Sequence, residues 1–204
     1  YFRPVEKALL HQGISIQPTF RKNRNKYKDR GSELKKQIQS LEHGKRIIVQ
    51  EIYPYAIYKF LWYVKKQKSL QQLNYKFNTL LDEKFRIKWP PKYKREKKKD
   101  KRVKNMQYLC SLLNNSDLGL KFSNPLRSPD SSCTSGELNG LCDEYDACLG
   151  AVVGIYFARN SSYACIAGDS DSGNMLLLAD RWLTNRLSGE VKVNNLKERS
   201  VVAK

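Results

Sequence analysis

The chain has 204 residues and a formal net charge of +18, from 38 Lys and Arg against 20 Asp and Glu. Hydrophobic residues make up 40% of the chain and aromatic residues 11%, which is enough for a buried core and excludes a wholly disordered protein. The longest apolar stretch, residues 147–158, is about a dozen residues long, too short for a membrane span. The length allows one domain or two small ones.

The excess of positive charge is confined to the first half of the chain. Residues 1–104 carry 29 basic and 9 acidic side chains, whereas residues 105–204 carry 9 and 11. Basic charge gathered in one block is typical of proteins that bind a polyanion. The sequence predicts an α+β protein with a basic, mainly helical module over 1–115, a linker over 116–140, and a near-neutral module of a β-hairpin plus a helix over 141–204.

The N-terminal segment is predicted to be an extended arm. Over residues 1–31, Pro4, Gly13 and Pro18 interrupt short apolar pieces, and a basic run over 21–30 follows. Such a run cannot bury itself, so the arm is expected to order only against a negatively charged partner.

Four elements are predicted before the main basic run. Hydrophobic spacing and turn residues indicate a helix over 33–43, a strand over 45–52 and an aromatic-rich helix over 55–66. A capping box at Ser69–Gln72 predicts a further helix over 70–84. The last two helices would form a helical hairpin, and their short turn is also compatible with a helix-turn-helix whose recognition helix is 70–84.

The densest charge run follows Pro90 and Pro91. Residues 92–104 contain nine positive charges in thirteen positions, offset only by Glu96 and Asp100. Phosphate neutralises such a run best, although the pattern is also typical of a nuclear-localisation signal or a membrane-surface segment. Spaced apolar residues predict that the run leads into a helix ending near Asn114.

The second half is predicted to be loop-like over 116–146, followed by a hairpin with strands at 151–158 and 163–168. An amphipathic helix over 175–187 would follow and stop at Gly189. A further edge strand is predicted at 191–193 or 201–202.

The acidic loop at Asp169–Gly173 offers oxygen ligands for a metal ion, but it lacks the calcium-loop pattern. Helix capping in a strand-to-helix loop is the favoured interpretation, and a metal-dependent nuclease using Asp169 and Asp171 is the alternative. The five cysteines form no C-x2-C pair and both histidines lie in the other half, so no structural zinc is predicted. The sequence predicts no catalytic residue, no bound metal and no cofactor.

The favoured function is that of a non-catalytic, structural RNA-binding component of a ribonucleoprotein particle such as a mitochondrial ribosome. RNA is the predicted partner, neighbouring proteins would contact the C-terminal module, and the location would be intracellular. A viral or chromosomal nucleic-acid-binding protein is the second possibility.

The predicted site residues are basic side chains for phosphates and aromatic rings for bases. The stacking candidates are Tyr27, Trp89 and Tyr93. The predicted phosphate-binding residues are Arg21, Lys22, Arg24, Lys26, Lys28, Arg30, Lys45, Arg46, Lys65, Lys66, Lys68, Lys76, Lys92, Lys94, Arg95, Lys97, Lys98, Lys99, Lys101, Arg102 and Lys104.

Overall fold

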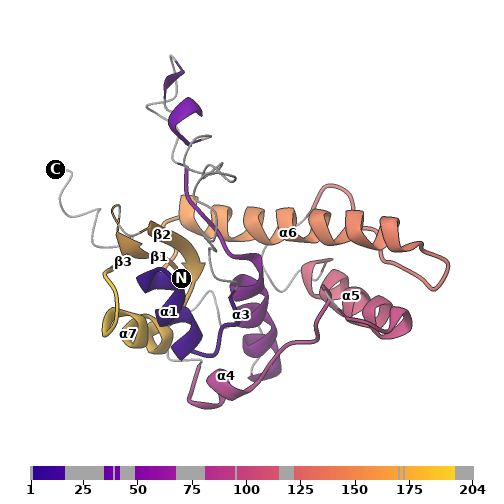
Figure 1. Ribbon diagram of the computed structural model, residues 1–204, viewed down its shortest axis with the longest axis horizontal. Helices are drawn as coiled ribbons and strands as arrows, with labels where there is room; N and C mark the ends of the chain where they lie inside the picture. The colour runs from indigo at the N-terminus through magenta and orange to yellow at the C-terminus, as the bar shows by residue number, and fades with distance from the viewer. Residues whose placement is uncertain are drawn as a thin grey trace.

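The α+β class predicted from the sequence is confirmed by the computed structural model, in which a small antiparallel sheet lies at one side of a mainly helical molecule (Figure 1). The described residues are 2–16, 35–38, 40–41, 49–67, 81–94, 96–114, 122–169, 171 and 173–195. The elements in chain order are α1 (Pro4–His11), α3 (Pro54–Gln67), α4 (Lys84–Ile87), α5 (Lys99–Asn114), α6 (Ser135–Ala158), β1 (Ala164–Asp169), β2 (Gly173–Leu178), α7 (Arg181–Ser188) and β3 (Val193–Asn195).

Helix α3 is the centre of the core, and the helix predicted over 55–66 is confirmed. Residues 56–64 are all buried. A helix that is apolar on nearly every side must be enclosed by other elements, and α3 packs against α6 and β2. None of the described helices is long and apolar enough to cross a membrane.

The sheet has the strand order β2-β1-β3, with β1 in the middle. The β1–β2 hairpin pairs Ala164 with Leu178 at one end and Asp169 with Gly173 at the other. Gly168 has a φ of +98°, and a side chain there would collide with the Gly173 carbonyl across the hairpin. Glycine is therefore required beside this tight turn.

Of the two predicted hairpin strands, the one over 163–168 is confirmed as β1, whereas the one over 151–158 is wrong. Residues 151–158, predicted as a strand, form the last turns of α6, and residues 173–178, assigned in part to a helix, form β2. The acidic loop therefore joins two strands and not a strand to a helix. Buried positions along 141–156 recur every three or four residues, which is helical spacing, but the β-branched and aromatic residues near its end also suit a strand.

Helix α6 begins inside the segment predicted to be a linker. A capping box starts it: the Thr134 N–H donates to Glu137 Oε2 at 2.7 Å, and the Glu137 N–H donates to Thr134 Oγ1 at 3.2 Å. The helix runs from beside α5 to the sheet (Figure 1). One continuous buried cluster includes side chains from both predicted modules.

The extended arm predicted at the N-terminus is wrong over residues 4–11, which form α1. Val5, Ala8 and Leu9 are buried at helical spacing, and α1 packs on β1 and β2. Pro4 occupies the first helical position, where its missing N–H costs nothing. The predicted arm beyond residue 16 lies outside the described residues.

The other predicted elements are described only in part. Within the helix predicted over 33–43, residues 35–38 are helical. Of the strand predicted over 45–52, Ile52 forms an isolated parallel bridge with Leu176. The helix predicted over 70–84 lies mostly outside the described residues, and α4 begins only at Lys84, so the helix-turn-helix stays a prediction.

Candidate nucleic-acid interface

Residues 84–104, here called the basic segment, run from α4 along one side of the molecule to the first turns of α5 (Figure 1). Arg95 is the one residue of this segment that is not described. Within the described part of the chain, six of its lysines have exposed side chains that form no hydrogen bond or ion pair: Lys84, Lys88, Lys92, Lys97, Lys98 and Lys104.

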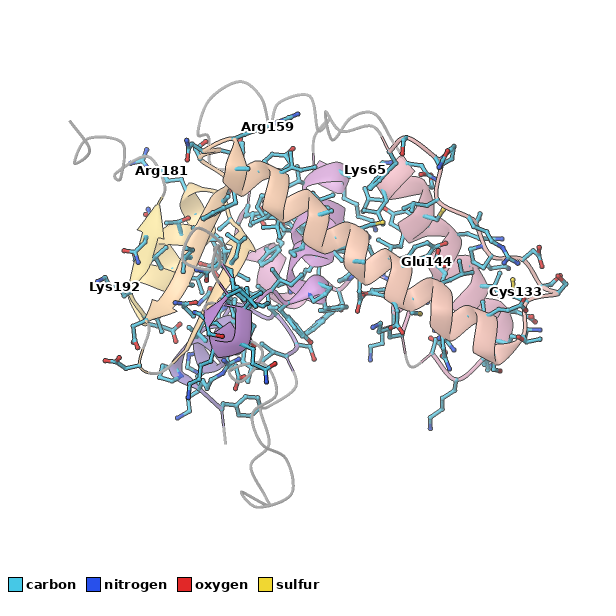
Figure 2. All side chains as sticks on the ribbon, turned by 90° about the horizontal axis from the view of Figure 1, so that it is seen from above. Lys65, Cys133, Glu144, Arg159, Arg181 and Lys192 are labelled. Carbon is cyan, nitrogen blue, oxygen red and sulfur yellow. The ribbon has the colours of Figure 1, made fainter. Side chains whose placement is uncertain are left out.

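The start of α5 lies at the end of the molecule remote from the sheet. Lys99 Nζ donates to the Ser131 carbonyl at 2.9 Å, next to Cys133. Figure 2 places Cys133 at one end of α6 and Arg181 and Lys192 beyond the opposite end. The free lysines of α5 are thus separated from the C-terminal sheet by the length of α6.

The positions of these lysines are unfavourable for the helix itself. Lys97, Lys98 and Lys99 lie at the N-terminus of α5, where the only acidic residue of the first turn is Asp100. The N-terminal end of a helix carries partial positive charge, so each exposed cation there costs a few tenths to about 1 kcal/mol. A bound polyanion would remove this repulsion.

Three predicted phosphate-binding residues are instead used within the protein. Arg102 donates to the Leu138 carbonyl at 3.3 Å and to Asn139 Oδ1 at 2.8 Å, which joins α5 to α6. Lys94 binds the Asp146 carboxylate, and Lys101 lies 3.3 Å from Glu96. Their roles in the described structure are therefore intramolecular.

The three stacking candidates differ in whether their rings are accessible to a base. Tyr93 is buried, its hydroxyl donates to Asp146 at 2.6 Å, and its ring packs edge-on against Tyr58. It cannot stack on a base in this position, so that prediction is wrong. Trp89 is 45% exposed and remains accessible, while Tyr27 lies outside the described residues.

The remaining predicted residues fall into two groups. Lys65 and Lys66 end α3, and Lys66 Nζ lies 4.7 Å from the centre of the Trp62 ring. In Figure 2, Lys65 lies away from Cys133 and the start of α6. The others lie outside the described residues: Arg21, Lys22, Arg24, Lys26, Lys28, Arg30, Lys45, Arg46, Lys68, Lys76 and Arg95.

Sequence reasoning missed Lys84, Lys88 and Lys59. The first two are exposed near Trp89, and their spacing of four along the chain was a usable signal. Lys59 is fully buried in α3, donates to the Gly13 carbonyl, and carries its amine 4.5 Å from the centres of both the Phe85 and Trp89 rings. Nothing local distinguishes it from a surface lysine of an amphipathic helix.

Burial lowers the pKa of Lys59 to about 8, from an ordinary value of 10.5. Between these two values the unfolded chain holds this proton and the folded protein does not, so the free energy of unfolding rises with pH. Between pH 7.5 and 9.5 we expect the free energy of unfolding, measured by urea denaturation, to rise by about 2 kcal/mol more in the wild type than in Lys59→Met, because the buried cysteines titrate alike in both proteins. An identical pH dependence in both proteins would contradict the assignment.

The acidic loop forms the hairpin turn, where the Asp171 N–H donates to Asp169 Oδ1 at 2.9 Å. In the described part of the chain, no group of three or more His, Cys, Asp and Glu side chains is arranged to hold a metal ion. The five cysteines are free thiols, and burial raises the pKa of Cys165 to about 12.

Comparison with known proteins finds no matching family model, no similar curated protein and no similar solved structure.

Proposed function

We propose that the protein is a structural RNA-binding component of a ribonucleoprotein particle, such as a mitochondrial ribosome, and that it acts without catalysis. The observation that carries this proposal is the set of six exposed, unpartnered lysines in the basic segment. Lysines displace the condensed counterions of a nucleic acid, which supplies most of the sequence-independent affinity.

The six lysines lie on a segment that is attached to the rest of the protein, and this attachment favours binding to a large, fixed polyanion. Arg102 and Lys94 hold the segment against α6, so the free lysines project from an ordered surface. Three lysines at the start of α5 oppose the helix dipole, and the first turn has one acidic residue, Asp100, so a bound external anion would reduce the remaining repulsion. The near-neutral C-terminal part would then remain available to contact neighbouring proteins of the particle.

The test is a salt titration of binding to a structured RNA and to a DNA duplex of equal length, with the full chain. If all six lysines bind phosphates, the slope of log affinity against log salt is expected to be about −4 to −5, with tighter binding to RNA. Tighter binding to DNA would favour the chromosomal alternative. The absence of binding to either polymer at low salt would contradict the proposal.

A further inference from the structure

Trp89 is an exposed aromatic side chain whose ring contacts a buried lysine. It follows α4 and precedes Pro90, which is buried, and Pro91. Two consecutive prolines restrict the backbone and limit how far the ring can move. Lys59 Nζ lies 4.5 Å from the centre of the ring, so one side of the indole rests on a buried cation while 45% of the residue is open to solvent.

The cation beneath the ring is itself fixed by the core. The Lys59 amine donates to the Gly13 carbonyl and also lies 4.5 Å from the centre of the Phe85 ring. Phe85 is fully buried and packs edge-on against Tyr63. The indole of Trp89 is therefore positioned before any ligand arrives, which lowers the entropy cost of binding to it.

A surface pocket of about 390 Å³ is lined by Ile87, two residues before Trp89 in the chain. Gly13 also lines the pocket, and its carbonyl accepts a hydrogen bond from the Lys59 amine that contacts Trp89. Ile87, 73% exposed, contributes an apolar wall. The full lining is Leu10, His11, Gly13, Glu83, Arg86 and Ile87.

The pocket combines apolar and hydrogen-bonding surface. Arg86 Nε donates to the His11 carbonyl at 3.0 Å and Arg86 Nη1 to Glu83 at 3.3 Å, so its polar wall is ordered. Gly13 has a φ of +68°, and a side chain there would collide with the Arg86 carbonyl.

The geometry points to single-stranded nucleic acid as the ligand, with one unpaired base stacked on the exposed face of Trp89. The inference rests on the proposed function. Lys84, Lys88 and Lys92 precede and follow the ring along the chain, where they bind the flanking phosphates. Bases in a duplex are stacked on one another and expose no face to an indole, whereas unpaired bases stack readily on aromatic side chains.

The test compares a 12-nucleotide oligouridine with a 12-base-pair RNA duplex at 0.15 M salt, by fluorescence anisotropy with the full chain. Trp89→Ala is expected to weaken binding to the single strand about tenfold and binding to the duplex less than twofold. The salt slope should stay unchanged because no charge is removed. Ile155→Ala, which removes an exposed apolar side chain from α6, is the matched control and should bind both ligands as the wild type does.

A second readout keeps the inference testable if Trp89→Ala destabilises the fold. Trp89→Phe keeps an aromatic ring over Lys59. The tryptophan fluorescence that is present in the wild type and absent from this variant comes from Trp89. Oligouridine should quench that emission, and an unquenched Trp89 would overturn the inference. Equal losses for strand and duplex in Trp89→Ala, or no loss for either, would also overturn it while leaving duplex binding as support for the proposed function. If the wild type binds neither ligand, the proposed function itself fails.

Discussion

Replacing Lys97, Lys98 and Lys104 together by Glu is expected to weaken RNA binding about a hundredfold at 0.15 M salt. Each lysine is exposed and unpartnered in the described part of the chain, so the change removes phosphate contacts without breaking an internal one. Two of the new carboxylates would lie before the first turn of α5, where negative charge stabilises a helix. Thermal unfolding should therefore show equal or slightly higher stability, and anisotropy titration should show the loss of binding.

The matched control reverses three charges at the other end of the molecule. Lys7, Arg181 and Lys192 are exposed, and Figure 2 shows the last two far from Cys133 and the start of α5. Their replacement by Glu changes the net charge by the same amount. At 0.15 M salt the Debye length is about 8 Å, so charges this remote are screened and the control should lose less than about threefold. Equal losses in both triple variants would show that net charge, and not the basic segment, governs binding.

Asp180→Ala is expected to lower the free energy of unfolding by about 3 kcal/mol, the largest single-residue effect on stability predicted here. The Asp180 carboxylate is fully buried. It accepts the Leu183 N–H at 2.9 Å, capping α7, and the Leu81 N–H at 2.7 Å, which ties the chain before α4 to the C-terminal helix. Alanine would leave both N–H groups buried without this acceptor. Urea denaturation monitored by circular dichroism measures the change.

Two further variants serve as comparisons for the stability of Asp180→Ala. Asp180→Asn keeps one carbonyl oxygen as an acceptor and should cost about half as much as alanine. Asp143→Ala removes an exposed carboxylate that lies 3.6 Å from Lys94, and it should change stability by less than about 0.5 kcal/mol. A loss below 1 kcal/mol in Asp180→Ala would show that the cap and the link to Leu81 contribute little.

The elements that the sequence predicts well are those defined by neighbours in the chain. The apolar run of α3 and the spaced residues of α5 predict these helices and their ends within a few residues, because helical periodicity is a local property. Local sequence patterns do not predict the helix over residues 141–158. The β-branched and aromatic residues of this stretch are compatible with either a strand or a helix, and the choice of helix follows from packing against α3, α5 and the sheet.

The sequence by itself determined the segregation of charge, the position of the basic segment and the types of side chain available for a nucleic acid. Only the tertiary structure decided which of those side chains are free. Arg102 and Lys94 bind acceptors on α6 that are 37 and 52 residues away in the chain. Tyr93 is buried and bonded to Asp146, while Trp89, four residues earlier, stays accessible. Exposure and pairing depend on contacts between segments distant in sequence, and spacing along the chain carries no record of those contacts.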